Sequence, residues 1–301
     1  MMFNNMMRAE IWLQDRLASQ QGIEDLAERL GYSSSQIRRN FKRCFGVSPS
    51  TYRDRLRLDK AALLLSYTQL GINEIALQCG YRNHSAFSRA FLRNYRISPR
   101  EFRKAEKLKL EIRRRTMEHD YHVRIGHAKD QQTVVTRFYS TQAARNTALD
   151  FLDHEALEAL PERLRDESPI AIVHGNPLTA DFTCADLGVQ IKADIADELA
   201  PPLPFRSLGL PAYRYASVTV DDLSELGDTL TFLLAKALPE RGEFASGLPL
   251  KLLWPNGNAR QRHKRKSGIE VRLPLSGERD NTTPAPYSPL ADRTDRRSSK
   301  I

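Results

Sequence analysis

The sequence of 301 residues contains only three cysteines, Cys44, Cys79 and Cys184, which lie far apart along the chain. An odd number at such wide spacing excludes a disulfide framework and supplies no ligand set for a zinc site. No uninterrupted apolar run of about eighteen residues is present, which argues against a membrane-spanning helix. The opening residues, MMFNNMMRAEIW, lack the basic flank and apolar stretch of a secretory signal. We therefore expect a cytoplasmic protein of a reducing compartment, with no membrane partner.

Catalytic motifs are also missing. The sequence has no nucleophile elbow, no phosphate-binding loop and no dinucleotide fingerprint. His119, His122 and His127 lie close together, and a metal site is one interpretation of them. Unlinked polar histidines are the favoured interpretation. We expect no catalytic residue, no metal and no cofactor, and so a protein that is not an enzyme.

Charge is unevenly distributed along the chain. The whole sequence has 46 lysines and arginines against 37 aspartates and glutamates, a formal net charge of +9. Residues 1–115 hold 23 of the basic and 11 of the acidic residues, so the rest of the chain is slightly acidic. This asymmetry favours a polyanion as partner of the first third of the chain. A solvated basic surface without a partner is the alternative that charge alone leaves open.

One small unit occurs twice, as GIEDLAERLGYSSSQIRRNF from Gly22 and as GINEIALQCGYRNHSAFSRAF from Gly71. In the first copy, apolar residues at i, i+3, i+4 and i+7 predict a short helix that ends at Gly31. Ser33 or Ser34 can cap a second helix. The apolar face of that second helix is Ile37, Phe41, Cys44 and Phe45. The second copy has the same pattern with one additional turn residue, so both predict a helix-turn-helix.

Each copy is followed by Ser-Pro and an aromatic residue, in GVSPSTYR and RISPREFR. Pro49 and Pro99 suit the first turn of a further helix. Between the copies, YRDRLRLDKAALLLSYT has no glycine or proline and predicts one continuous linking helix. We expect leucines of this helix to contact both copies and its arginines to face water largely. The leucines are Leu56, Leu63 and Leu64, and the arginines are Arg53, Arg55 and Arg57.

The second helix of each copy has an exposed face without any acidic residue. Arginine suits guanine, glutamine suits adenine, and serine adapts to several base edges or to phosphate. A helix used only for packing more often carries Glu and Lys pairs on such a face. The candidate DNA-binding residues are Ser35, Gln36, Arg38, Arg39 and Lys42 in the first copy and His84, Ser85, Ser88 and Arg89 in the second.

On these residues the chain resembles the AraC/XylS family of bacterial transcription regulators. The resemblance covers both repeats, the linking helix and both Ser-Pro junctions, and it implies an all-α domain over residues 8–112 with two helix-turn-helix lobes. It implies that the base-reading residues are Ser35, Arg38 and Arg39 in the first copy and His84, Ser85, Ser88 and Arg89 in the second, with Arg39 and Arg89 foremost. It also implies that the partners are double-stranded DNA and RNA polymerase. Arg96 departs from the pattern, because the first copy has Gly46 there, so the second turn is expected to differ.

Two different recognition helices on one chain predict how DNA is bound. Most helix-turn-helix proteins dimerise to reach major grooves about 34 Å apart. A duplicated motif places two helices in successive grooves without a second chain. We therefore expect a monomer on an asymmetric site of roughly 20 base pairs.

The remaining chain alternates between strand and helix patterns. Strands are expected in TVVTRFYS, SPIAIVHGNP, CADLGVQIKA, YRYASVTV, LPLKLLWP and IEVRLPL. Helices are expected in QAARNTALDFLDHEALEALPERL and DLSELGDTLTFLLAKAL. The pattern predicts an α+β domain with an antiparallel sheet over residues 120–276. The tail 277–301 is polar and proline-bearing and is expected to be disordered. The basic stretch RQRHKRK (260–266) is expected to be a solvated hairpin loop, with an extra DNA contact as the alternative.

This layout is similar to the GyrI-like effector-binding domain, on the order of its elements and the motifs LLWP and IEVRLPL. The similarity implies that Glu270 faces a cleft and meets the positive charge of a small amphipathic effector. A buried carboxylate also favours a cationic partner on physical grounds. Aromatic walls are expected from Tyr213, Tyr215 and Trp254, and further from Phe182 and Phe205. Two alternatives remain open: Glu270 lies exposed or pairs with Arg272, and the C-terminal domain is a protein-interaction or sequestration module without a small ligand.

Overall fold

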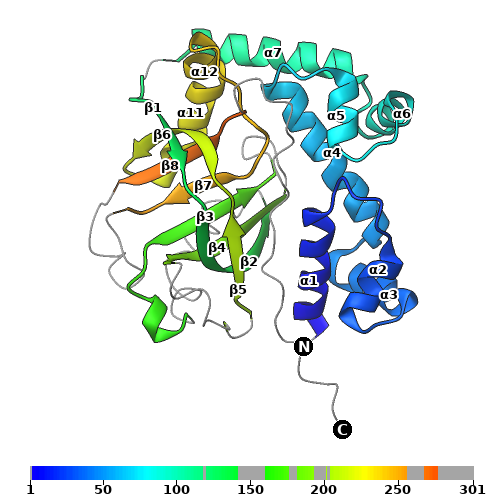
Figure 1. Ribbon diagram of the computed structural model, residues 1–301. Helices are drawn as coiled ribbons and strands as arrows, with labels where there is room; N and C mark the ends of the chain where they lie inside the picture. The colour runs from blue at the N-terminus through cyan, green and yellow to red at the C-terminus, as the bar shows by residue number, and fades with distance from the viewer. Residues whose placement is uncertain are drawn as a thin grey trace.

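The computed structural model describes residues 2–117, 120–141, 160–175, 182–192, 201, 204–255 and 268–276. The helical N-terminal region lies beside a strongly curled sheet (Figure 1). Its helices are α1 (Met2–Asp15), α2 (Ile23–Leu30), α3 (Ser34–Phe45), α4 (Pro49–Tyr67), α5 (Ile72–Gln78), α6 (His84–Tyr95) and α7 (Pro99–Arg115). The two predicted helix pairs, α2 with α3 and α5 with α6, are therefore present, and the long linking helix is α4.

Lobe 1 comprises α1, α2, α3 and the start of α4. Its core is formed by apolar residues that recur on one face of each helix, with Phe41 and Ile37 of α3 fully buried. Tyr52 of α4 packs edge-on against Phe41, with ring centroids 5.4 Å apart. Helix α1 was not predicted from the sequence, although Met6, Ala9 and Leu13 recur at helical spacing and are buried in this core.

Lobe 2 comprises the end of α4 with α5, α6 and α7, and it repeats the plan of lobe 1. Phe91 occupies the position of Phe41 and is also fully buried. Phe102 packs edge-on against Phe91 at 5.2 Å, as Tyr52 packs against Phe41. The fifty-residue spacing in the sequence thus corresponds to two equivalent aromatic pairs, one in each lobe.

Helix α4 links the lobes as predicted, but two of its arginines do not face water. Leu64 is fully buried in the core of lobe 2. Arg53 Nη1 donates to the carbonyl of Gln21 at 2.6 Å. Arg57 Nε donates to the carbonyl of Leu17 at 2.7 Å. The expectation was wrong for these two residues because the segment between α1 and α2 leaves carbonyls without helical partners, and long arginine side chains reach them.

The sheet region, residues 120–276, contains eight described strands in the order β1-β6-β8-β7-β3-β4-β2-β5. Every pairing between neighbours is antiparallel, so the predicted antiparallel sheet is confirmed. The strands are β1 (Arg124–Ala128), β2 (Gln131–Thr141), β3 (Pro169–His174), β4 (Phe182–Ile191), β5 (Arg206–Leu210), β6 (Tyr213–Val220), β7 (Leu250–Leu253) and β8 (Ile269–Pro274). Six of them fall in the predicted segments, while β1 and β5 were not predicted.

One face of the sheet packs on the helical segment that follows β6. This segment comprises η4 (Leu223–Glu225), α11 (Leu226–Phe232), the π-helical η5 (Leu233–Ala237) and α12 (Leu238–Glu240). Alternate residues of the strands meet it, among them Val218 and Leu252, in the largest core of the molecule. The helix expected over 142–164 lies mostly outside the described residues, and its last part forms the 3-10 turn η3 (Glu162–Leu164). The basic stretch 260–266 and the tail 277–301 also lie outside them.

Both lobes contact the sheet region. Lobe 1 does so through α1, which lies between α2 and α3 on one side and the sheet on the other (Figure 1). Lobe 2 does so through α7, whose Leu110 packs with Tyr121 against the largest core. None of the described helices combines the length and the apolar character needed to cross a membrane.

Candidate nucleic-acid interface

The second helix of each copy begins at a defined cap. Ser33 caps α3, since its side chain accepts from the Gln36 amide at 3.2 Å while the Gln36 carbonyl oxygen Oε1 accepts from the Ser33 amide at 2.9 Å. Of the two serines proposed as caps, Ser33 is therefore the one used. Asn83 caps α6, because its Oδ1 accepts from the Ala86 amide at 2.8 Å. Such caps fix where each recognition helix starts and hence which residues its first turn presents.

Both recognition helices also end in the same way. Gly46 closes α3 in the left-handed conformation with φ of 74°. Arg96 closes α6 in that conformation too, with φ of 64°, and donates its amide to the Leu92 carbonyl at 2.8 Å. The expectation of a different second turn was wrong. The backbone turn is the same in both copies, and Arg96 adopts the left-handed conformation at a cost of roughly 1–2 kcal/mol for a residue with a Cβ.

The candidate residues of α3 lie on its exposed face. Ser35, Arg39 and Lys42 are exposed, whereas Ile37 and Phe41 between them are buried. Gln36 is exposed too, although its side-chain oxygen is used in the cap. Arg38 pairs with Glu24 of α2 at 3.3 Å, with side chains that are 56% and 71% exposed. An exposed pair of this kind stabilises little and can open, so Arg38 can still reach a phosphate.

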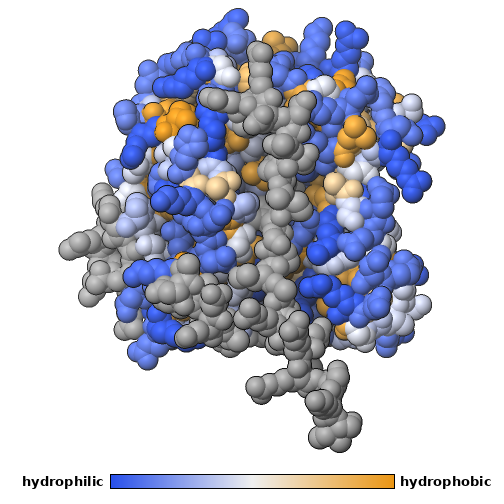
Figure 2. Space-filling view, viewed as in Figure 1, coloured by the Kyte–Doolittle hydropathy of each residue, from blue (hydrophilic) through white to orange (hydrophobic). Residues whose placement is uncertain are grey.

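The candidate residues of α6 form an equivalent face. His84, Ser85 and Arg89 are exposed, and Ser88 is half-buried. Ser88 Oγ lies 3.3 Å from His84 Nε2, so these two side chains are held together on one turn. Neither α3 nor α6 contains an acidic residue. In Figure 1 the two helices lie at the edge of the molecule that faces away from the sheet, and Figure 2 shows this edge as mainly hydrophilic. Both faces are thus open and free of acids on their own helices.

The residues expected to bind an effector are only partly brought together. Tyr213 and Tyr215 of β6 lie on the same sheet face as Glu270 of β8, because Thr219 is the register partner of Glu270. Glu270 Oε2 accepts from Arg272 Nη2 at 2.8 Å, and both side chains are 15% exposed. Of the alternatives for Glu270, pairing with Arg272 is therefore what the structure shows.

Two cations lie over the tyrosine rings of this face. Arg272 is 4.3 Å from the ring centroid of Tyr215, and Lys251 Nζ is 3.9 Å from that of Tyr213. Burial and the nearby Arg272 lower the pKa of Lys251 to about 7, whereas the Tyr213 ring favours its charged form. The carboxylate of Glu270 is thus already compensated by a guanidinium of the protein itself.

Trp254 does not lie on this face. Register places Leu253 opposite Glu270, so the next residue, Trp254, points to the other side of the sheet. There it is 4% exposed and packs in the largest core. The prediction that Trp254 forms an aromatic wall beside Glu270 was wrong. Side chains alternate between the two faces of a sheet, and the sequence alone did not fix which face Trp254 takes. Phe205 is buried in a separate small core, and the side chain of Phe182 lies outside the described residues.

Sequence reasoning missed a second group of polar side chains, which lies between α1 and the sheet. It contains Glu10, Arg137, His174, Asp186 and Arg206. A signal was present, since TVVTRFYS and CADLGVQIKA each carry one charged residue in the middle of a strand that reads as buried. Within the described part of the chain, no group of three or more His, Cys, Asp or Glu residues is arranged to hold a metal ion.

The family model of a helix-turn-helix domain matches residues 26–105. The HTH-type transcriptional activator RhaS of Escherichia coli O139:H28 is 36% identical over 92 residues, which are 31% of this chain and 33% of that protein. RhaS of Enterobacter sp. (strain 638) is 35% identical over 100 residues, 33% of this chain and 36% of that protein. The chain thus matches only about a third of the length of these curated relatives.

Among solved structures, a transcriptional regulator from Chromobacterium violaceum, described as an AraC-type DNA-binding domain-containing protein, is similar to this chain. It is 31% identical, with 34% of this chain and 91% of that chain covered and a TM-score of 0.33. The family model and the relatives confirm the predicted helix-turn-helix region. The residues that the family model matches all lie in the helical region, and none of them belongs to the sheet region.

Proposed function

We propose that this protein is a transcription regulator that binds a specific double-stranded DNA site with α3 and α6 in two adjacent major grooves. The observation that carries this proposal is the pair of recognition helices with equivalent caps, equivalent ends and open faces without acidic residues. The relatives named above as transcriptional activators support it. RNA polymerase as a further partner is part of the same proposal and rests on the resemblance to the AraC/XylS family.

The two helices are expected to read different base sequences. Arg39 and Arg89, both exposed, are suited to bidentate contact with guanine. Ser35 and Ser85 lie in the first turns, where a short side chain lets the helix approach the base edges. Arg38 and Lys42 are also exposed residues of α3, and Lys42, further along the helix, is suited to phosphate. The site is therefore asymmetric, and one chain is sufficient to occupy it.

Arginine-to-alanine substitutions test the assignment of base contacts. Arg39→Ala and Arg89→Ala are each expected to weaken specific binding by about 1–3 kcal/mol and to relax the preference at one base position. Binding of each variant to a site-variant library, measured at fixed salt, shows both effects. Arg163→Ala removes an exposed arginine of the sheet region and is the matched control. A loss that is equal for all DNA sequences would assign these arginines to phosphate instead.

We further propose that the sheet region binds a small amphipathic effector on the face of Glu270, Tyr213 and Tyr215. The GyrI-like layout supports this, as do two tyrosine rings and an ion pair gathered on one sheet face. Arg272 already occupies Glu270, so a cationic effector must displace a guanidinium. An effector with an aromatic ring and no net positive charge does not have to displace Arg272, because its ring or an acceptor group can contact Arg272 and Lys251 directly.

A ligand panel with the full-length chain tests this second proposal. Amphipathic compounds that are anionic, neutral or cationic are added in turn, and the melting temperature is recorded, since a ligand specific for the folded state raises it. Glu270→Gln is expected to change the preference among these classes. Glu243→Gln, which alters another carboxylate paired with an arginine, Arg214, at 2.7 Å, is the matched control. If the two variants show the same shifts in melting temperature, Glu270 is not part of the site. If no class of compound raises the melting temperature, the alternative of a protein-interaction module is favoured.

A further inference from the structure

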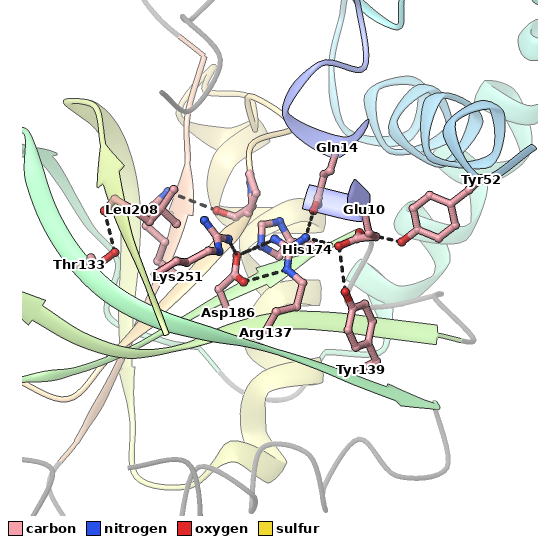
Figure 3. A network of polar contacts seen from close by, with 12 residues as sticks. Glu10, Gln14, Tyr52, Thr133, Arg137, Tyr139, His174, Asp186, Leu208 and Lys251 are labelled. Carbon is pink, nitrogen blue, oxygen red and sulfur yellow. Dashed lines mark hydrogen bonds and ion pairs between the residues drawn. The ribbon is translucent and has the colours of Figure 1, made fainter. Parts of the chain in front are cut away.

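A buried ionic cluster joins α1 of lobe 1 to the sheet (Figure 3). Arg137 of β2 lies at its centre and is almost fully buried. Its Nε and Nη2 donate to Asp186 of β4 at 2.9 and 2.7 Å. Its Nη1 donates to Glu10 and to Gln14 of α1, each at 2.6 Å. A single guanidinium therefore holds a carboxylate of the sheet and two side chains of the DNA-binding lobe.

Each carboxylate of the cluster has several further partners. Asp186 accepts from Arg206 of β5 at 2.8 Å, and its Oδ2 lies 2.7 Å from His174 Nε2. Glu10 accepts from the hydroxyls of Tyr139 at 3.0 Å and Tyr52 at 2.8 Å. Burial alone would raise the pKa of Asp186, but Arg137, Arg206 and His174 hold that pKa well below its usual range. Asp186 is thus held as a carboxylate by several donors, as a buried charge requires, while among the described residues His174 Nδ1 and Arg206 Nε have no hydrogen-bond partner.

Comparison of the two lobes shows that the cluster belongs to lobe 1 alone. Tyr52 and Phe102 occupy equivalent positions in the duplicated unit, each packed on a buried phenylalanine. Only Tyr52 carries a hydroxyl, and that hydroxyl reaches Glu10. Since Phe102 fills the same position in lobe 2, the hydroxyl is not needed for the fold of a lobe. Its partner suggests that it serves the junction with the sheet region.

Lobe 2 contacts the sheet region in a different manner. Leu110 of α7 and Tyr67 of α4 pack against the apolar core beneath α11 and η5. Within the sheet region, Tyr121 adds to the same core and lies 5.4 Å from Phe232 in an edge-on ring contact. Gly247 approaches α4 so closely that a Cβ there would lie 2.7 Å from the Leu64 side chain. The sheet region therefore holds lobe 2 mainly by apolar packing, with one exposed ion pair between Arg114 and Glu240 at 3.3 Å. It holds lobe 1 mainly by the polar cluster, with one ring contact between Phe45 and Tyr139 at 5.7 Å, while α4 joins the lobes directly.

The cluster also shares a sheet face with the residues proposed to bind an effector. Strand register aligns Arg272 with Lys251, Lys251 with Ile172, Ile172 with Asp186, and Asp186 with Arg137. Directly paired residues of neighbouring strands point to the same side. One row of side chains thus leads from Arg272 to Arg137, which binds Glu10 and Gln14 of α1.

We propose that this ionic cluster is the contact by which the sheet region fixes lobe 1, and with it α3, relative to α6. The proposal rests on the proposed two-groove binding of DNA. The docked arrangement suits that role because the cluster meets lobe 1 on α1 and α4, while the candidate base-reading side chains of α3 remain exposed. The sheet region then acts as a brace between the lobes, and opening the cluster frees lobe 1 to move on α4.

Single-atom changes in the full-length chain test this brace. Tyr52→Phe removes the hydroxyl that reaches Glu10, and Glu10→Gln removes the charge that meets Arg137. Tyr95→Phe is the matched control, because the Tyr95 hydroxyl donates to Asp59 at 3.1 Å, and both residues belong to the helical region. All variants also carry Trp254→Phe, so that Trp12 of α1, which is 6% exposed, is the remaining tryptophan and its fluorescence reports on lobe 1.

The cluster variants are expected to speed hydrogen exchange of α1 and to shift Trp12 emission, with no change in α5 or α6. They are also expected to weaken binding to the full site about tenfold, because a freely moving lobe loses effective concentration, and to leave binding to a site with only the lobe 2 half unchanged. Tyr95→Phe is expected to change neither α1 exchange nor Trp12 emission. The proposed brace would be overturned if hydrogen exchange of α1 in the cluster variants were as slow as in the wild type. It would also be overturned if their affinity for the full site were unchanged or higher. Absence of specific DNA binding by the wild type would overturn the proposed function instead.

Discussion

Replacement of Arg137 by leucine is the most informative perturbation of stability. Leucine keeps an apolar body in a site that is 1% exposed, but it removes every hydrogen bond that the guanidinium donates. Two carboxylates, Asp186 and Glu10, then remain buried with one fewer partner each. Removal of one member of a buried ion pair typically lowers stability by about 3–5 kcal/mol.

The remaining partners place the expected value at the lower end of that range. Asp186 keeps Arg206 and His174, and Glu10 keeps the hydroxyls of Tyr52 and Tyr139. We therefore expect a loss of about 3 kcal/mol in the free energy of unfolding for Arg137→Leu. Arg38→Ala opens an ion pair whose side chains are 56% and 71% exposed, and such exposed pairs contribute at most about 1 kcal/mol.

Urea denaturation followed by tryptophan fluorescence measures both values. Trp12 in lobe 1 and Trp254 in the sheet region are the two tryptophans of the chain, so Trp→Phe variants at each position separate the two signals. The double variant Arg137→Leu/Asp186→Leu is expected to lose less than the sum of its single losses, because the two side chains form one unit. A loss below about 1 kcal/mol for Arg137→Leu would refute the assignment of a desolvated, tightly coupled cluster.

Two further predictions concern single residues. Arg96→Gly is expected to raise the free energy of unfolding by about 1 kcal/mol, because glycine adopts the positive φ at the end of α6 without strain. Thermal unfolding measures this difference. The control Arg93→Gly places glycine within α6 and is expected to destabilise the protein. Burial raises the pKa of Asp15 to about 6 against the opposing effect of Arg206 and Arg137, so its contribution to stability is largest below about pH 4 and is lost as pH rises through 6. Asp15→Asn is expected to stabilise the protein relative to wild type at pH 7, by at most about 3 kcal/mol for this partly buried group, and the difference should disappear near pH 4; a difference that is constant with pH would contradict the raised pKa.

The helix-turn-helix region could be predicted from the sequence because its signals are local. Apolar spacing, Gly31, the cap at Ser33 and the Ser-Pro junctions each act within a few residues, and the duplication supplied an internal check. Arg96 shows the limit of such reasoning. Its identity predicted a different turn, whereas the packing around Phe91 and Phe102 retained the turn and imposed the strain on the residue.

The candidate sites of the sheet region were harder to predict because they depend on strand register. Trp254 directly follows β7 and Glu270 lies in the neighbouring β8, and a shift of one residue decides whether their side chains share a face. The order of strands brings Arg137 and Asp186 together from positions about fifty residues apart, and α1 adds Glu10 from the far end of the chain. Sequence could indicate that each charge needed a partner, but only the fold selects which one.

Methylation protection of guanine N7, an atom of the major groove, on the bound DNA site, combined with the mass of the complex in solution, tests the central claim most directly. We expect one chain per site and protection in two successive major-groove segments about one helical turn apart, with different sequences in the two segments. Protection of a single groove segment, or a palindromic site occupied only by two chains, would contradict it.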